Sequence, residues 1–499
     1  MNILLLSMPD SFEHMPTVAV RMPNGALTSL AGNIDPQHNV AVADLVLVQK
    51  HVRRTVEELV RDVDPQLLGL SVMTFQRKTA LKIARLVRSL KPGVKVVVGG
   101  YDPSLAPEPY LGDACGIDFI VRGEGEVTCR ELVRALENNS PLDQIPGLSW
   151  RDASGWTHNP SRPVHSLEGE EIKLPRRTAR VLGGYTMLGR SVDVVETSRG
   201  CTFDCSFCSI IAMRGRNFHT YSFDRVLADI RDAASHGAKS IFLVDDNITL
   251  NIHRFEALCR AIIEARLNHL EYIIQGMTSA IANQGATLAP LMRQAGFKYV
   301  FLGIENVLED DLQFLRASAK NRAREDGHTT GNATLQAIDY LHRNKIYVVG
   351  GLIVGNPNDS RESIEANLDF ARRYIDWPYI QHPTPYPGTP MTDDFVRRNL
   401  LVNTRVEEYD GTTAVVRSEQ LDSEEIEYLR WRKERWMKLA HFPVALRRSP
   451  GFVLRHGLSM LAHTFRGSTV RTFLRLEDER AAFRRYRQIR AAERDYLSA

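Results

Sequence analysis

The chain has 499 residues, too many for one ordinary hydrophobic core, so we expect two or three domains. Apolar residues make up 43% and charged residues 25% of it, as in soluble globular proteins, and a net charge of +3 indicates no particular partner. It has no run of about 20 apolar residues that could span a membrane, no signal peptide, and too few cysteines for a disulfide framework. These features predict a cytoplasmic protein.

The first expected domain, residues 1–150, alternates short apolar runs with segments of helical periodicity. This alternation predicts an α/β fold, a parallel sheet with helices on both faces, of the Rossmann-like or flavodoxin-like kind. The expected strands are residues 2–7, 40–47, 67–73, 94–100 and 118–122, and the expected helices are residues 53–63 and 79–90.

Ligands of such a sheet bind at the carboxyl ends of its strands, so we looked for candidates there. Paired glycines at one strand end would let a ligand approach the backbone closely. The candidates are the loop 8–25, Ser71, Met73, Thr74, Gly99 and Gly100.

Residues 151–190 are rich in proline, glycine, serine and charge, and they lack sustained periodicity. We interpret them as a linker that wraps between two domains, with a short hairpin near residues 148–156. The basic residues of 173–180 are expected to form a solvated face.

In the second expected domain, residues 191–417, six apolar runs are joined largely by helical segments. This pattern suggests an open (β/α)6 barrel, in which reactive groups belong at the carboxyl ends of the strands. The expected strands are residues 192–197, 240–244, 272–277, 299–304, 346–354 and 379–384, and the expected helices are 223–236, 253–265, 288–295, 334–344 and 364–374.

Three cysteines, Cys201, Cys205 and Cys208, follow the first of these strands at CxxxCxxC spacing. Structural zinc sites usually pair two cysteines with a second, distant pair, which this sequence lacks. Electron-transfer clusters take four cysteines. Three thiolates therefore fit a [4Fe–4S] cluster with one iron left open to a small molecule. Each of the other cysteines, Cys115, Cys129 and Cys259, is expected to be a packed thiol.

With the aromatic Phe207 directly before Cys208, this motif resembles the signature of radical S-adenosylmethionine (SAM) enzymes. The resemblance implies that SAM binds the open iron, and that an external one-electron reductant is needed to cleave it to a 5′-deoxyadenosyl radical. It also implies SAM contacts at Asp245 and Asp246 after the second strand, Glu305 after the fourth, and Gly351, Ile353 and Gly355 in a GxIxG strand.

Structural alternatives exist for these acidic residues. Asp245 or Asp246 could form a helix cap or a turn, and Glu305 could belong to a structural salt bridge. The rigid turn 385–390 is expected to border the substrate, with Tyr386 as a weak candidate for contact with it.

The strand and helix order of residues 1–150, followed by the RGEGE sequence at 122–126, resembles the cobalamin-binding domain fused to many radical SAM enzymes. This implies cobalamin at Ser71, Met73, Thr74, Gly99 and Gly100. The sequence lacks the DxHxxG motif of the better-known members, so we expect His14 to be a solvated loop residue. The alternative is a domain that has lost its cofactor and shapes the substrate site.

The last region, residues 418–499, is predicted to be helical and basic. Residues 423–440 form an amphipathic pattern, and residues 480–494 a solvated helix of mixed charge. The basic amphipathic run 452–476 could lie on a membrane surface, but a helical cap on the barrel is favoured. The apolar stripe of the first helix holds Ile426, Leu429, Trp436, Met437 and Ala440, with Trp431 outside it.

Together these features resemble the class B radical SAM methyltransferases. We expect a cobalamin-dependent enzyme that methylates an unactivated carbon of a small-molecule, natural-product or lipid substrate, with no nucleic-acid partner. The alternatives are a radical SAM cyclase or rearranging enzyme and a non-catalytic iron–sulfur sensor.

Overall fold

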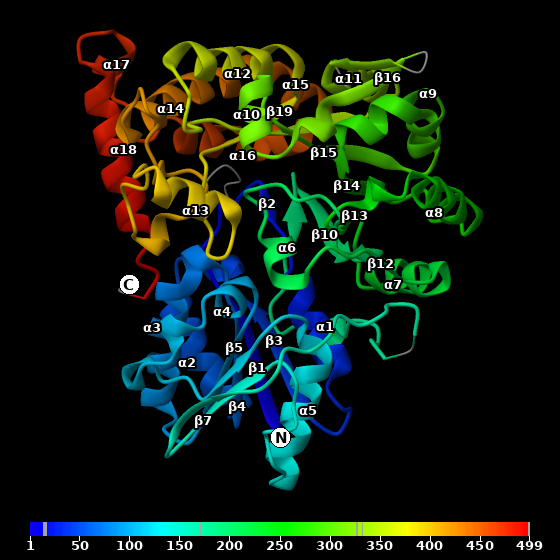
Figure 1. Cartoon of the computed structure of the whole chain (residues 1–499), viewed down its shortest axis with the longest axis vertical. Coiled ribbons are helices and arrows are strands. Elements are labelled where there is room, and N and C mark those ends of the chain that lie inside the picture. Colours follow the sequence, from blue (N-terminus) through cyan, green and yellow to red (C-terminus); the bar gives the residue numbers. More distant parts are fainter. Residues whose placement is uncertain (13–16, 170, 326–327, 332, 498–499) are drawn as a thin grey trace.

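The computed structural model describes residues 1–12, 17–169, 171–325, 328–331 and 333–497, and two sheets organise it (Figure 1). His14 lies outside the described residues. The first sheet has the order β3-β1-β4-β5-β6-β7-β8. Its first five strands are parallel, and their order along the chain, 2-1-3-4-5, is that of flavodoxin-like folds, as predicted. These strands are β1 (Asn2–Ser7), β3 (Asn39–Asp44), β4 (Leu67–Ser71), β5 (Lys95–Gly99) and β6 (Phe119–Val121).

Helices cover both faces of this sheet. The expected helices are present as α2 (Val52–Val63) and α3 (Arg77–Leu90), and they share one core with the sheet. The opposite face is covered by α1 (Gly25–Asn33) and α5 (Gly125–Asn138), which were not predicted. Their glycine, serine, threonine and asparagine residues have weak helix propensity, so tertiary packing stabilises them. The predicted hairpin is confirmed as β7 (Leu148–Asp152) and β8 (Gly155–His158), and it extends this sheet.

The second sheet contains six adjacent parallel strands that follow one another along the chain, which confirms the predicted open barrel. Two short antiparallel strands, β9 (Thr186–Met187) and β2 (Val20–Arg21), extend it beyond β10. Because β2 comes from the first loop of the amino-terminal domain, backbone hydrogen bonds join the two domains. The six strands are β10 (Arg190–Val195), β13 (Ser240–Leu243), β14 (Glu271–Met277), β15 (Phe297–Glu305), β18 (Tyr347–Ile353) and β19 (Trp377–Gln381).

The predicted barrel helices are present, and the apolar residues of their inner faces share one core with alternate residues of the strands. Only α9 differs much in length from its expected range: it begins directly after β14 and continues through Pro290. The helices are α7 (Phe223–Ser235), α8 (Ile252–Glu264), α9 (Thr278–Gln294), α11 (Ala333–Arg343) and α12 (Arg361–Tyr374). Shorter elements are α4 (Tyr101–Leu105), α6 (Ser209–Arg214), α10 (Glu309–Phe314), β11 (Ser198–Arg199), β12 (His219–Thr220), β16 (Arg322–Glu325) and β17 (His328–Gly331).

The carboxyl-terminal region is helical, as predicted, but two of its details differ from the prediction. Trp436 is 50% exposed whereas Trp431 is only 3% exposed. The reason is that Trp431 packs against Phe483 and Tyr486 of the last helix, at ring-centroid distances of 5.2 and 5.7 Å. That last helix is therefore not simply solvated. The helices are α13 (Pro390–Arg397), α14 (Ser423–Ala440), α15 (Phe442–Arg448), α16 (Pro450–Thr464), α17 (Val470–Phe473) and α18 (Glu479–Glu493).

The basic part of the linker also differs from the prediction, because Arg177 is buried rather than solvated. Its guanidinium donates to Asp193 of β10 at 3.0 Å and to Asp229 of α7 at 2.6 Å. These ion pairs fix the linker to the barrel. Within the described part of the chain, no helix is long and apolar enough to cross a membrane.

Candidate active site

The cysteine loop lies at the carboxyl end of the barrel, between β10 and α6. Cys205 is buried, and Cys201 and Cys208 are partly exposed; none forms a disulfide. Two distant segments brace the loop around Ser206. Its backbone N–H donates to the Leu315 carbonyl at 3.0 Å, and its carbonyl accepts from the Met391 N–H at 2.9 Å. The loop is therefore positioned by residues more than a hundred positions further along the chain.

The thiols are suited to a cluster rather than to a single metal ion. Among the described residues, no three histidine, cysteine or acidic side chains are arranged to hold one ion. A cubane cluster does not require such convergence, because its cysteines bind separate irons. Burial raises the pKa of Cys205, and it raises the pKa of Cys208 to about 12, so a metal that binds these sulfur atoms displaces protons from them. Three soft sulfur ligands in one loop fit an iron–sulfur cluster.

Asp245 and Asp246 both hold the segment that leads into Cys201. The buried Asp245 carboxylate accepts from the Thr197 backbone N–H at 2.7 Å and from the hydroxyls of Thr197 and Ser198. Asp246 Oδ2 accepts from the Gly200 N–H at 2.7 Å. The geometry thus gives Asp245 the turn-forming role that the sequence left open. Contact of either residue with SAM stays a prediction, and Asp246 is the less fully hydrogen-bonded of the two.

Glu305 combines strain and burial at the end of β15. Its φ angle is +64°, a left-handed conformation that costs a non-glycine residue about 1 kcal/mol or more. The carboxylate lies close to Gly303, since a Cβ atom built there would be 2.9 Å from Glu305 Oε1. Glu305 Oε1 accepts from Lys320 Nζ at 2.6 Å.

Lys320, in the turn Ser318–Asn321, was missed by the sequence analysis because no motif surrounds it. Its ammonium lies 5.6 Å from the centre of the Phe207 ring. Burial opposes its charge, but Glu305 and Cys205 raise its pKa above the ordinary value, so it remains a cation. A buried positive charge beside cysteine thiols would balance the negative charge of a thiolate-bound cluster.

The GxIxG residues lie on β18 and the turn after it. A Cβ atom on Gly351 would lie 3.0 Å from the Phe301 ring, and Ile353 packs in the same cluster as Phe207. Gly355, at φ +101°, donates its N–H to Asp359 at 2.7 Å. A further residue, Asn247, places its amide nitrogen 3.8 Å from the Cys201 sulfur.

Three of the predicted cobalamin residues, Ser71, Gly99 and Gly100, line a cavity of about 120 Å³ in the first domain, between the sheet and α1 and α5. Met73 and Thr74 lie outside this cavity; Met73 packs against the same apolar cluster as Phe207 instead. The wall of the cavity is rich in glycine, and larger residues at these positions would occupy part of the cavity. The cavity therefore fits part of a bulky cofactor such as cobalamin. Its glycines are Gly69, Gly99, Gly100, Gly123 and Gly125.

This cavity and the cysteine loop belong to facing surfaces of the two domains. Helix α4 starts directly after Gly100 and packs against α6. Burial raises the pKa of Tyr101 at the start of α4, and the nearby Asp246 and Cys208 raise it further. In Figure 1 the first sheet lies below the barrel, with α4 and α6 at the junction.

Buried ion pairs cross the same junction. Arg199, two residues before Cys201, pairs with Glu126 of the first domain, and Arg214 of α6 pairs with Glu124. Both glutamates belong to the RGEGE sequence, whose individual roles the sequence analysis did not assign. They link the cobalamin-side domain directly to the cysteine loop.

Comparisons with known proteins match a family to the domain on each side of this junction. Residues 195–371 match the radical SAM superfamily and residues 15–133 match the B12-binding domain. An uncharacterized methyltransferase of Pyrococcus horikoshii is 28% identical over 431 residues, 86% of this chain and 90% of that protein. The anaerobic magnesium-protoporphyrin IX monomethyl ester cyclase of Synechocystis is 28% identical over 332 residues, 64% of each chain.

Among solved structures, the radical SAM methyltransferase TsrM of Kitasatospora setae, with cobalamin and a [4Fe–4S] cluster bound, has the same fold. It superposes with a TM-score of 0.64 at 21% identity, covering 81% of this chain and 79% of that one. The two domain matches agree with the three cysteines found at the domain junction. The chain is a B12-binding radical SAM protein, an enzyme whose cofactors are a [4Fe–4S] cluster, SAM and cobalamin.

Proposed function

We propose that this enzyme is a methyltransferase that acts on an unactivated carbon of a natural-product or lipid substrate. One observation carries the proposal: the glycine-rich cavity of the first domain and the cysteine loop of the barrel lie on facing surfaces that buried ion pairs hold together. A methyl donor and a radical generator must act on the same substrate, so they need this proximity. The similarity to a methyltransferase over most of both chains also supports it.

When bound, the reduced cluster supplies the electron that cleaves SAM to a 5′-deoxyadenosyl radical, and cobalamin supplies the methyl group. In our proposal Cys201, Cys205 and Cys208 hold the cluster, while Asp246 and Glu305 orient SAM together with the backbone of Gly351 and Ile353. Ser71, Gly99 and Gly100 form part of the wall around cobalamin.

The surrounding residues orient these groups and exclude water, which is the usual contribution of a protein to radical chemistry. Lys320 supplies a fixed positive charge, and Asp245 and Arg199 hold the cysteine loop in place. Tyr386, whose hydroxyl donates to the Tyr409 carbonyl at 3.1 Å, is more readily explained as a packed ring than as a radical contact. The electron comes from an external one-electron reductant.

A second candidate, a cyclase or another rearranging enzyme, is favoured by the similarity to the magnesium-protoporphyrin cyclase. The two functions differ in how SAM is consumed. Methyl transfer through cobalamin converts SAM to S-adenosylhomocysteine, whereas a rearrangement consumes it only for the radical step.

The test uses the reconstituted, reduced protein with SAM, in the presence and absence of cobalamin, and follows both SAM products by chromatography. A methyltransferase is expected to form S-adenosylhomocysteine only when cobalamin is present, in an amount close to the bound cobalamin before any substrate is added. Formation of 5′-deoxyadenosine without S-adenosylhomocysteine would contradict methyl transfer and favour the cyclase.

A further inference from the structure

A second cavity lies at the opposite end of the barrel from the cysteine loop. It reaches Tyr299 on β15, six residues before Glu305, which at about 3.3 Å per residue places it roughly 20 Å from the cofactor end. We call it the basal pocket. Its lining includes Met187, Tyr347, Trp377, Met437, Phe442 and Phe452.

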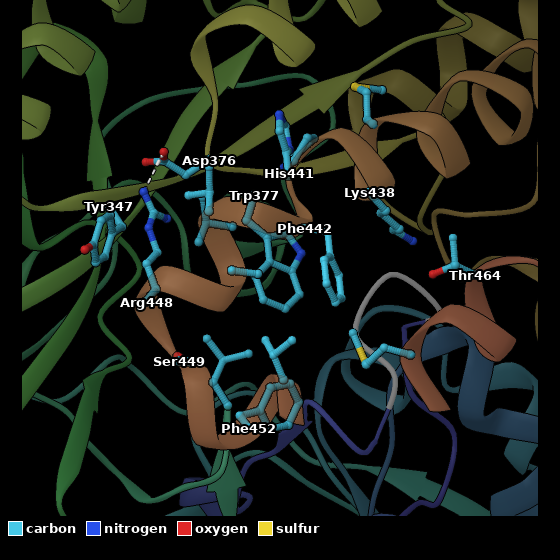
Figure 2. A pocket seen from close by; sticks show the side chains of 18 of the residues that line it. Tyr347, Asp376, Trp377, Lys438, His441, Phe442, Arg448, Ser449, Phe452 and Thr464 are labelled. Atoms are coloured by element: carbon cyan, nitrogen blue, oxygen red, sulfur yellow. Dashed lines mark hydrogen bonds and ion pairs between the residues drawn. The ribbon is translucent and has the colours of Figure 1, made fainter. Parts of the chain in front are cut away.

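The basal pocket is enclosed by parts of the chain that are far apart in the sequence. The early residues of β15, β18 and β19 form one wall, α14, α15 and α16 form another, and β2 and β9 contribute to the rest. In Figure 2 the rings of Trp377, Phe442 and Phe452 point into one space, between Lys438 on one side and the Arg448–Asp376 pair on the other. These walls belong to both domains and to the carboxyl-terminal helices, so the pocket is a product of the complete fold.

The pocket is large and apolar enough to hold a ligand. Its volume is about 170 Å³, more than the roughly 150 Å³ of an apolar cavity known to stay dry and bind benzene. Aliphatic, aromatic and methionine side chains make up most of its wall, and such surfaces adapt to apolar guests. Transfer from water into this pocket is therefore favourable for an apolar molecule.

The charged groups of the wall are already paired with each other. Arg448 donates to Asp376 at 2.7 Å and lies 3.3 Å from the centre of the Tyr347 ring, and Lys438 Nζ is 2.9 Å from Glu434. An ionic headgroup would thus lose its hydration without gaining a free partner. One polar atom of the wall, His441 Nδ1, is buried and has no hydrogen-bond partner among the described residues. Because His441 Nε2 donates to the Arg372 carbonyl at 3.3 Å, Nδ1 is left as an acceptor, which suits a hydroxyl group.

We propose that the basal pocket is a second ligand site, which binds an uncharged, mainly hydrocarbon molecule such as an acyl-chain or isoprenoid alcohol. The molecule is either the remote part of a long substrate or a separate lipid. The proposal concerns binding and does not depend on methyl transfer, so it can fail or succeed independently of the proposed function.

The experiment measures quenching of tryptophan fluorescence in the full-length protein by an ω-bromo undecanol, because a bound bromine atom quenches the neighbouring Trp377. Saturable quenching is expected, and it should largely disappear in Trp377→Phe. The matching ω-bromo undecanoate should bind about tenfold or more weakly, because its charge has no free partner in the wall.

Gly457 of α16 offers a matched pair of variants. A Cβ atom there would lie 3.5 Å from Val453 and 3.6 Å from Phe442, an ordinary contact distance, so Gly457→Ala should fold and bind. Gly457→Leu should fill the pocket and weaken binding of the alcohol about tenfold or more. Both residues favour a helix, and the melting temperature of each variant checks that it has folded.

Absence of saturable quenching, equal binding of the carboxylate, or unchanged binding in Gly457→Leu would overturn the proposal. If the alcohol does bind, a second measurement decides whether the natural ligand is part of the substrate or a separate lipid. If saturation with the alcohol changes the rate of 5′-deoxyadenosine formation in the reconstituted enzyme, the pocket holds part of the substrate. If the rate is the same, the pocket holds a separate lipid.

Discussion

The two ends of the barrel contain opposite kinds of chemistry. At the carboxyl end, buried charges face one another, as in Glu305 with Lys320 and Arg199 with Glu126, and Glu305 has a strained backbone. At the amino end, aliphatic, aromatic and methionine side chains surround an apolar pocket whose few charges are paired within the wall. Buried charge is costly to maintain. Its concentration at the carboxyl end fits polar cofactors there, and the paired charges of the amino end fit the apolar ligand that we propose for it.

The largest expected effect comes from the cysteine loop. Cys205→Ala should abolish SAM cleavage and lower the iron content from about four per chain to near zero after anaerobic reconstitution. Iron analysis and 5′-deoxyadenosine formation measure both effects. Cys115→Ser changes a cysteine far from the loop and should retain full iron content. A full, SAM-responsive cluster in Cys205→Ala would refute the ligand assignment.

Next comes the buried pair beside the loop. Lys320→Met leaves the Glu305 carboxylate without its partner and should lower the free energy of unfolding by about 3 to 5 kcal/mol. Urea unfolding of the cofactor-free protein measures this loss. The double variant Lys320→Met with Glu305→Gln should recover much of the stability but should still bind SAM weakly in equilibrium dialysis. Equal stability of the single and double variants would mean that the pair is unimportant.

A pH effect should come from the ion pair between the domains. Burial alone would raise the pKa of Glu126, but Arg199 lowers it to about 2, against 4.5 for an ordinary glutamate. Between these values the unfolded chain binds more protons than the folded one, so stability is complete above pH 4.5 and falls as the pH drops towards 2. At about 1.4 kcal/mol per pH unit, the loss is roughly 3 kcal/mol.

Urea unfolding at several pH values measures this dependence. Glu126→Gln removes the titrating group and should flatten the acidic side of the curve. Glu58→Gln, at an exposed pair on α2, is the matched control and should leave the curve unchanged. A wild-type slope that persists in Glu126→Gln would assign the acid sensitivity to other carboxyl groups.

The smallest expected effect lies at the apolar end. Gly457→Ala adds a methyl group within a helix without a close contact and should raise the free energy of unfolding by about 0.5 to 1 kcal/mol. Thermal unfolding detects this as a modest rise in melting temperature. A fall would mean that the wall of the basal pocket is packed more tightly than the distances indicate.

The sequence was sufficient to predict what depends on local patterns. Alternating apolar runs predicted both sheets, and the CxxxCxxC spacing predicted the loop that the structure places at the carboxyl end of the barrel. Lys320, Tyr101 and the partners of Glu124 and Glu126 were not predictable, because each acts through residues far away in the chain. The orientation of α14 was misjudged for a similar reason: periodicity predicts one buried face, and α18 creates a second.

The basal pocket was beyond prediction because eight separate helices and strands form it. Its residues, read in order, are ordinary core residues. The pocket exists because the helices after α14 cover the amino end of the strands without filling it.

The central claim is that both metal cofactors bind where the two domains meet, at the charged end of the barrel. Anomalous diffraction from crystals of the reconstituted protein, at the iron and cobalt absorption edges, tests it most directly. Our account predicts an iron peak beside Cys201, Cys205 and Cys208, and a cobalt peak between the Gly99–Gly100 turn and the cysteine loop. A cobalt peak elsewhere, or no iron peak beside these three cysteines in protein that retains iron, would contradict it.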